Sequence, residues 1–449
     1  MNRFKGILLS LSLSATTLTS CILTDNTLGS AYIPGNQDIS MKMADFNLPV
    51  TLKMADSLQT AVSANFIIGS ITTKDYGTFR VGTATSITPM TDTILWGTDP
   101  VFIDMYIQIG IAEKRFLSPE QQFIPQNVYA YELKAPLDTT FIYNNSITEL
   151  SYHPVPITSR NSIYMGGDSL KMHLTKEYGE RFFSATIEEC DSTELFINKF
   201  YGLYFRTDDI EEGLTGGRIN YFDIHSADVR ISFTSTNEAG KRRDTSVAFQ
   251  LGEYLSLNSM TSEARSMVTD NPVETLYYES LSGIKPHISG AALHSLMQNW
   301  ANQNNIELDN LVIAKATLEF PFEYSGNYKV LDNYPGNLFP CRRVRTKKHT
   351  LYTPIDEIYD NFMSKGSINR SLLHYKPDVG FYLQDLIKKE SSELTDEDDL
   401  WLMRTISHTN NTTNVTTHYP DFTYYNVAKF NGTGCERNPR LRIVYTVLK

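Results

Sequence analysis

The C-terminal stretch Arg440-Leu441-Arg442-Ile443-Val444-Tyr445-Thr446-Val447 carries the clearest structural signal in the sequence. From Leu441 to Val447 every second residue is large and apolar. Side chains of a β-strand point alternately to its two faces, so this period of two places the apolar residues on one face. The stretch is therefore predicted to be a strand at the edge or on the outside of a sheet, with one buried side.

The same texture extends back to about residue 48. Short segments rich in Val, Ile, Thr, Tyr and Phe alternate with Gly, Asn, Asp and Pro, a pattern typical of many strands. Further strands are predicted over residues 65–71, 101–109, 127–133, 170–174, 229–233, 311–322 and 400–406. Helical spacing is scarce and predicts one long helix and two shorter ones, over residues 289–302, 175–183 and 382–390. We expect a mainly β fold of β-sandwich or jelly-roll-like lobes with a few short helices.

Length and charge narrow the classes of protein. The chain has 449 residues, which allows two to three domains at about 150 residues each. We expect residues 49–449 to form two sandwich lobes that meet near residues 270–285. The 40 Lys+Arg and 51 Asp+Glu residues give a net charge of −11. An acidic surface repels the phosphate backbone, so no nucleic-acid partner is expected.

The N-terminus has the features of a secretory signal. Arg3 and Lys5 precede an apolar run over residues 7–13, and the small-residue junction Leu18-Thr19-Ser20 ends in Cys21. This junction resembles the lipobox of bacterial lipoproteins, which implies a signal peptide over residues 1–20 and lipidation of Cys21. A plain signal peptide with an incidental cysteine is the alternative. Residues 21–48 are polar and small, so a flexible tether is expected before the folded body.

Three cysteines follow the predicted lipidation site: Cys190, Cys341 and Cys435. In an oxidising compartment one disulfide, between Cys341 and Cys435, together with one buried thiol is an option. The spacing of the three residues matches no zinc or redox motif.

A series of short motifs follows Cys21 in a fixed order. These are Leu28-Gly29-Ser30 with Ile33-Pro34, Asp56-Ser57-Leu58-Gln59-Thr60, Ile68-Gly69-Ser70 with Tyr76-Gly77, Pro100 with Ile103-Asp104, Val128-Tyr129-Ala130-Tyr131-Glu132-Leu133, Gly167-Asp168-Ser169-Leu170, Phe200-Tyr201-Gly202-Leu203-Tyr204-Phe205, Ala314-Lys315-Ala316-Thr317-Leu318 and Pro439 to Thr446. In this order they resemble the Bacteroidota envelope lipoproteins grouped as domain of unknown function 4270. The resemblance covers nearly the whole mature chain. It implies a lipid-anchored, β-rich envelope protein and supplies no catalytic residues.

Gly167-Asp168-Ser169-Leu170 also matches the opening of a nucleophile block in one lipase and esterase family. That chemistry needs a histidine base with an aspartate three positions before it. None of the nine histidines has Asp or Glu at that offset. Because the block runs into the alternating Leu170, Met172 and Leu174, we interpret it as the start of a strand.

Two acidic runs are candidates for paired-carboxylate or calcium chemistry, Asp208-Asp209-Ile210-Glu211-Glu212 and Asp396-Glu397-Asp398-Asp399. Both are interpreted as solvated loops, with calcium binding as the alternative, although the EF-hand spacing is absent. The basic run Arg342-Arg343-Val344-Arg345-Thr346-Lys347-Lys348 is interpreted as an edge strand protected by charge. Contact with phosphate or carboxylate groups of an envelope polysaccharide or a protein partner is the alternative.

Other site signals are weak. His287 and His294 lie seven residues apart and are too far from each other to share a metal ion. No phosphate-binding glycine motif occurs, so nucleotide use is unsupported. The 26 Tyr and 23 Phe residues are expected mostly in strand cores. A few in polar segments, such as Tyr277-Tyr278 and Tyr424-Tyr425, are candidates for stacking on sugars or partner proteins.

The sequence thus identifies no catalytic, cofactor-binding or metal-binding residue, and Cys21 is its one assigned site. It favours a non-enzymatic, lipid-anchored protein of the cell envelope, in the outer membrane, that binds a surface glycan or an outer-membrane protein partner. The membrane is contacted through the N-terminal lipid. A glycan-directed hydrolase with paired carboxylates and an accessory of an outer-membrane secretion or assembly machine are the alternatives.

Overall fold

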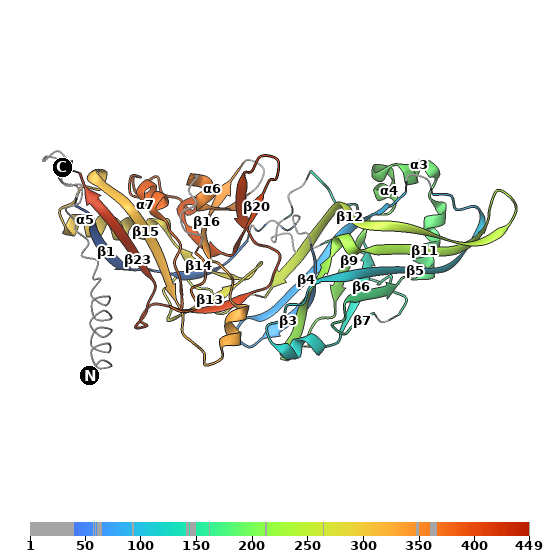
Figure 1. The fold of residues 1–449 in the computed structure, drawn as a ribbon, viewed down its shortest axis with the longest axis horizontal. Coiled ribbons are helices and arrows are strands. Elements are labelled where there is room, and N and C mark those ends of the chain that lie inside the picture. The colour runs from blue at the N-terminus through green and yellow to red at the C-terminus, as the bar shows by residue number, and fades with distance from the viewer. Residues whose placement is uncertain are drawn as a thin grey trace, which may run out of the picture.

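In the computed structural model the described residues are 40–448 apart from 57, 59, 61–64, 92–93, 141–142, 144–149, 161, 212, 264, 347–349 and 360–365. The predicted signal peptide, Cys21 and residues 22–39 of the predicted tether lie outside them. The described chain is mainly β, with several sheets and a few short helices, which confirms the predicted fold class. Two lobes lie side by side along the long axis of the molecule (Figure 1).

The first lobe contains the longest strands. They are β3 (Asn65–Thr73), β4 (Gly77–Pro89), β5 (Thr98–Glu113), β6 (Gln126–Glu132), β7 (Ile163–Tyr164), β8 (Ser169–His173), β9 (Leu203–Thr207), β10 (Gly216–Asp223), β11 (Asp228–Thr236) and β12 (Arg242–Ser262). Six of them close a circuit of antiparallel pairs in the order β3, β4, β12, β11, β5, β10 and back to β3. β9 pairs with β4 and continues through β6 to β7, while β8 pairs with β5.

Each strand of this circuit contributes to one buried apolar cluster. Phenylalanine rings supply much of its volume: Phe182 stacks on Phe200 with ring centroids 4.3 Å apart, and both rings are buried. Short helices contribute buried or partly buried residues to this cluster. They are α2 (Lys176–Arg181), η3 (Phe182–Ser184), α3 (Ile187–Asp191), α4 (Thr193–Lys199) and η4 (Ile224–Ser226). A further short helix, η2 (Pro119–Phe123), contacts β10. Side-chain caps start four of the helices, at Thr175, Thr186, Ser192 and Asp223, so local sequence signals fix where these helices begin.

The second lobe contains β1 (Lys42–Asn47), β2 (Thr51–Met54), β13 (Thr275–Glu279), β14 (Ile284–Ile288), β15 (Leu311–Pro321), β16 (Phe339–Arg345), β17 (Thr350–Pro354), β18 (His374–Tyr375), β19 (Leu400–Met403), β20 (Thr405–Thr409), β21 (Thr416–Pro420), β22 (Val427–Asn431) and β23 (Arg440–Val447). One sheet has the order β1-β23-β15-β18 and another the order β17-β16-β19-β14-β2. Both sheets contribute to a single buried apolar cluster, as the layers of a sandwich do. β13 pairs with β22, and β20 pairs with β21 in a hairpin.

The helices of the second lobe are α5 (Gly290–Gln303), η5 (Leu308–Asn310), η6 (Tyr328–Asn333), α6 (Ile355–Tyr359), α7 (Gly380–Leu386) and η7 (Asp396–Asp398). The Ser289 side chain caps α5 by accepting the Ala292 N–H, and Leu293 and Met297 bury its apolar face. This is the long helix predicted from the sequence. No helix in the described part of the chain is both long and apolar enough to cross a membrane.

The two lobes are joined by buried polar and aromatic contacts. Arg265 follows β12 and donates from Nε and Nη2 to the Glu279 carboxylate at 3.0–3.3 Å, and both side chains are buried. Arg265 Nη1 also donates to the Thr78 carbonyl of β4 at 3.0 Å. Tyr425 stacks on Phe79 of the first lobe with centroids 5.0 Å apart and donates to Glu279 at 2.7 Å. These contacts tie the two lobes together through buried side chains.

Three expectations about organisation need correction. The predicted tether reached residue 48, whereas residues 42–47 form β1, paired with β23. Because β1 lies on one side and β15 on the other, β23 is an inner strand rather than an edge, although its alternate apolar residues are buried as predicted. A single crossing near 270–285 was expected, but the chain also crosses between β2 and β3, because β1 and β2 complete sheets of the second lobe.

The cysteines do not form the disulfide that was one option from the sequence. Cys190, Cys341 and Cys435 are all free thiols, so no Cys341–Cys435 disulfide is formed. Cys341 is fully buried in β16, while the partly exposed Cys435 lies 3.3 Å from the Glu274 carbonyl.

Candidate functional site

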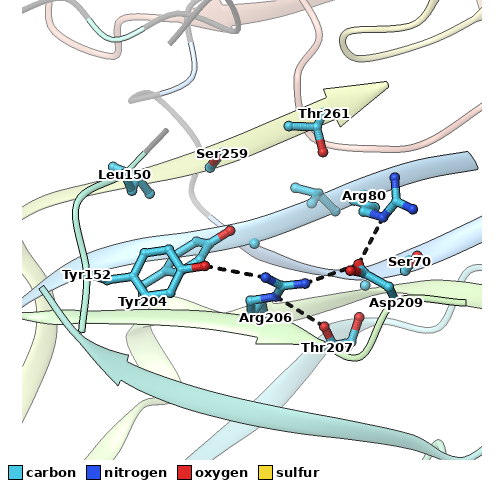
Figure 2. A pocket seen from close by; sticks show the side chains of 13 residues that line it. Ser70, Arg80, Leu150, Tyr152, Tyr204, Arg206, Thr207, Asp209, Ser259 and Thr261 are labelled. Carbon is cyan, nitrogen blue, oxygen red and sulfur yellow. Dashed lines mark hydrogen bonds and ion pairs between the residues drawn. The ribbon is translucent and has the colours of Figure 1, made fainter. Parts of the chain in front are cut away.

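A pocket of about 440 Å³ opens on the first lobe, over β3, β4, β9 and the end of β12. Leu150 and Tyr152, from the segment after β6, form its remaining wall (Figure 2). β9 supplies its central residues, because Leu203 and Phe205 point into the core while Tyr204 and Arg206 alternate with them. The strand pattern thus presents an aromatic ring and a guanidinium group side by side.

An ion-paired network forms one end of the pocket. Asp209 Oδ1 accepts hydrogen bonds from Arg80 Nε at 2.9 Å and from Arg206 Nη2 at 3.1 Å (Figure 2). Arg80 also pairs with Glu263 at 3.3 Å. The side chains remain partly exposed, so the pairing itself adds little to stability. Its consequence is a fixed, planar set of donors and acceptors with nearly balanced charge.

Tyrosine rings form the other end. The Tyr152 and Tyr204 rings lie 5.0 Å apart, and Tyr131 lies 5.2 Å from Tyr152. The Tyr152 hydroxyl accepts a hydrogen bond from Arg206 at 3.4 Å, which connects the rings to the charged network. Burial raises the pKa of Tyr204, so its hydroxyl stays protonated at neutral pH and keeps its hydrogen to donate.

Gly82 and Ser70 shape the floor of the pocket. A Cβ at Gly82 would lie 2.6 Å from the Tyr204 hydroxyl and 2.5 Å from the Phe205 carbonyl, so only glycine lets β9 and its tyrosine approach β4 this closely. Ser70 is 1% exposed, and among the described residues its Oγ has no hydrogen-bond partner. A buried hydroxyl without a partner is costly, and a polar ligand would satisfy it.

The arrangement favours binding over hydrolysis. Glycoside hydrolysis needs two carboxyl groups presented to the scissile bond, one of them protonated. Asp209 and Glu263 both pair with Arg80, so a guanidinium group of the chain already engages each carboxylate. The pocket therefore offers an aromatic face and polar groups with nearly balanced charge, suited to a hydroxyl-rich ligand.

No family model, curated protein or solved structure matches this chain. The geometry of the pocket and the sequence motifs are therefore what support a function. Cys21, the one site assigned from sequence, lies outside the described residues.

Gly167-Asp168-Ser169-Leu170 has the predicted strand role. Ser169 and Leu170 begin β8, which pairs with β5, and Asp168 forms an ion pair with Lys114 at 2.6 Å. His173 on the same strand bonds instead to Asp104 at 3.0 Å.

The two acidic runs differ. Asp208 and Asp209 lie in an exposed loop after β9, as predicted, where Asp208 accepts hydrogen bonds from Asn127 and Tyr129 and Asp209 borders the pocket, while Glu212 lies outside the described residues. In the second run, which was also expected to be a solvated loop, Asp398 is buried in η7 and pairs with Arg342 and Lys389. Cations of the chain pair with Asp209 and Asp398, which argues against calcium binding by these two carboxylates.

The basic run is also neutralised internally. β16 as a whole lies between β17 and β19, so it is not the predicted edge strand, but its basic residues 342–345 pair with β17 alone. Arg343 pairs with Asp56 at 2.9 Å, and both Arg343 and Arg345 pair with Asp396. Lys347 and Lys348 lie outside the described residues. The chain's own carboxylates thus occupy the groups proposed for a polysaccharide.

The remaining candidates are structural. His287 bonds to Asp399 at 2.8 Å and His294 to the Lys389 carbonyl at 3.0 Å, so the two histidines have separate partners. Tyr278 and Tyr425 are buried core residues, while Tyr277 and Tyr424 are only partly exposed. The tyrosines named from the sequence are therefore not the ones that line the pocket. A usable signal was the alternation of Tyr204 and Arg206 with two apolar residues on one short strand.

Proposed function

We propose that this chain is a lipid-anchored cell-envelope protein whose first lobe binds a surface glycan without chemical conversion. The observation that carries the proposal is the pocket in which Tyr152 and Tyr204 lie beside the Arg80–Asp209–Arg206 network. Aromatic rings stack on the apolar faces of sugars, and planar charged groups hydrogen-bond to neighbouring hydroxyls. The unpartnered Ser70 hydroxyl adds a further polar contact inside the pocket.

The anchor rests on the sequence. The positive, apolar and small-residue segments that end in Cys21 support acylation there and attachment to the outer membrane. The order of short motifs supports membership of the family of envelope lipoproteins that the chain resembles. Binding to an outer-membrane protein partner, or acting as an accessory of an outer-membrane assembly machine, is a less specific alternative, since no surface among the described residues favours it.

Glycan binding is tested with the full chain in detergent. Affinity electrophoresis through gels containing mannan, xylan, laminarin or dextran compares the wild type with Tyr152→Ala and Tyr204→Ala. Loss of a stacking ring weakens retention by one matrix by about tenfold or more. Tyr328→Ala is the matched control, because this tyrosine is 51% exposed in the second lobe, away from the pocket. Equal migration in every gel, or equal retention of all three variants, would refute the proposal.

Anchoring is tested separately. We expect Cys21→Ala to move the protein out of the membrane fraction, because the acyl chains are its anchor. Cys190→Ala removes a buried cysteine that cannot be lipidated and should leave fractionation unchanged. Membrane association of Cys21→Ala at the wild-type level would remove the anchor from the proposal and leave the glycan site standing.

A further inference from the structure

Three side chains with metal-binding groups lie close together in the second lobe, whereas the tyrosine pocket belongs to the first lobe. Asp356 and Glu357 lie on α6, and His418 lies on β21. One ligand atom from each residue lies within 4.8 Å of the other two. Asp356 and His418 are buried, and Glu357 is partly buried.

Backbone and side-chain contacts hold the cluster together. β17 ends at Pro354 and leads directly into α6, while the β20–β21 hairpin returns His418 to the same place. His418 Nδ1 lies 3.0 Å from Asp356 Oδ2, and the His418 backbone N–H donates to Glu357 Oε1. The three groups are thus positioned by a helix and a hairpin rather than by one loop.

The charge of the cluster is unbalanced. Three other buried carboxylates in this lobe each have an arginine or lysine partner: Glu279 with Arg265, Asp398 with Arg342 and Lys389, and Asp421 with Arg404. Asp378 is an exception, since it is buried and forms no ion pair with Lys or Arg among the described residues. Within the described part of the chain, neither Asp356 nor Glu357 forms an ion pair with Lys or Arg. Two carboxylates beside one imidazole therefore leave excess negative charge in a place shielded from water.

The donor set and its spacing fit a transition-metal ion. One imidazole nitrogen with two carboxylate oxygens is a ligand combination that zinc accepts, with bonds of about 2.0–2.2 Å. Ligand atoms around one such tetrahedral ion lie about 3.4 Å apart, so the cluster closes on an ion after a shift of about 1 Å. We propose that Asp356, Glu357 and His418 bind a divalent transition-metal ion of the zinc type.

The ion would fasten the β20–β21 hairpin to α6. Burial of two of the three ligands gives it a structural role, because a catalytic metal needs an open position that a substrate can reach. This inference is independent of the glycan pocket and of the anchor.

The test uses the full chain in detergent, with any affinity tag removed. After treatment with a chelator, Zn²⁺ is titrated by calorimetry and bound metal is counted by elemental analysis. We expect about one ion per chain, with proton release on binding. Co²⁺ should give the visible absorption bands of a nitrogen and oxygen site, without the thiolate band that Cys341 would produce.

Glu357→Gln is the sharpest variant. Glutamine keeps the Oε1 acceptor for the His418 N–H, so the apo protein should unfold at the wild-type temperature while zinc affinity falls about 10- to 100-fold. His418→Gln should abolish the Co²⁺ bands. His408→Gln, on the exposed strand of the same hairpin, is the matched control and should bind zinc as the wild type does.

Two results would overturn the inference. If the natively folded wild-type chain takes up no zinc or cobalt, the cluster is a hydrogen-bonded Asp–His pair only. Alternatively, Glu357→Gln and His418→Gln could bind as tightly as the wild type, which would place the metal elsewhere.

Discussion

The tyrosine pocket and the Asp356–Glu357–His418 cluster differ in how far their acidic and basic side chains balance. At the pocket two guanidinium groups, of Arg80 and Arg206, pair with two carboxylates, of Asp209 and Glu263. In the cluster two carboxylates share one imidazole. The pocket is therefore close to neutral and partly exposed, whereas the cluster is negative and largely buried.

This difference decides which ligand each region suits. Where charges are already paired, further binding depends on ring stacking and hydrogen bonds, which fits a hydroxyl-rich ligand. Where negative charge is buried without a matching cation, a metal ion supplies the missing charge. Counting paired and unpaired charges separates the two sites, although both contain carboxylates and both escape motif searches.

The largest expected effect concerns the buried Arg265–Glu279 pair, in which one cation balances one carboxylate. This pair is the reference against which the pocket and the cluster are compared. Arg265→Met should lower the free energy of unfolding by about 3–5 kcal/mol, because Glu279 would be left buried without its cation. Chemical denaturation of the full chain measures the loss. Arg345→Met removes an exposed partner of Asp396 and should cost much less, because solvent screens exposed ion pairs. If the two variants lost similar stability, burial of the carboxylate would not decide the cost of removing its cation.

A smaller effect is expected in the pocket. Arg206→Met should leave stability within about 1 kcal/mol of wild type, since Asp209 keeps Arg80 as a partner. Glycan retention should fall about tenfold, or ~1.4 kcal/mol, because the donor between the tyrosines and Asp209 is lost. Affinity electrophoresis and denaturation of the same preparation measure the two quantities. A variant that lost stability but kept its retention would assign Arg206 a structural role.

Sequence patterns predicted the secondary structure better than the environment of charged residues. Alternation identified β23, and the Leu293 and Met297 spacing identified α5, because burial of one face leaves a local record in the sequence. The position of β23 inside its sheet was missed, because it depends on β1 near the other end of the chain. Pairing partners separated by hundreds of residues leave no local pattern.

The same limit explains the sites. Arg80 and Asp209 are 129 residues apart, and Asp356 and His418 come from separate strands and helices, so no spacing rule connects them. The acidic runs were interpreted as solvated loops and the basic run as an edge strand, because charged residues are mostly exposed. Asp398 and Arg342 are instead buried or nearly so, because each supplies the other's counter-charge. Only the three-dimensional fold reveals which charged side chains lack a counter-charge.

The smallest expected effect is a change in pH dependence at the cluster. Burial raises the pKa of Asp356 above its ordinary value of 3.8, so above that pH the folded chain holds a proton that the unfolded chain has lost. The free energy of unfolding attributable to Asp356 therefore falls as the pH rises from 3.8 through the raised pKa. Asp356→Asn should remove this fall, measured by denaturation in chelator between about pH 4 and pH 7.

Two comparisons sharpen this last prediction. The hydrogen bond from Arg345 lowers the pKa of Asp396, so the contribution of Asp396 to stability is lost as the pH falls. Asp396→Asn should therefore change the slope of the unfolding free energy against pH in the direction opposite to that of Asp356→Asn. Saturating Zn²⁺ should also reverse the slope of the wild type, because a metal binds the ionised carboxylate and stability then grows as protons leave. If Asp356→Asn altered the pH dependence of the free energy of unfolding but saturating zinc did not, the cluster would titrate without binding a metal.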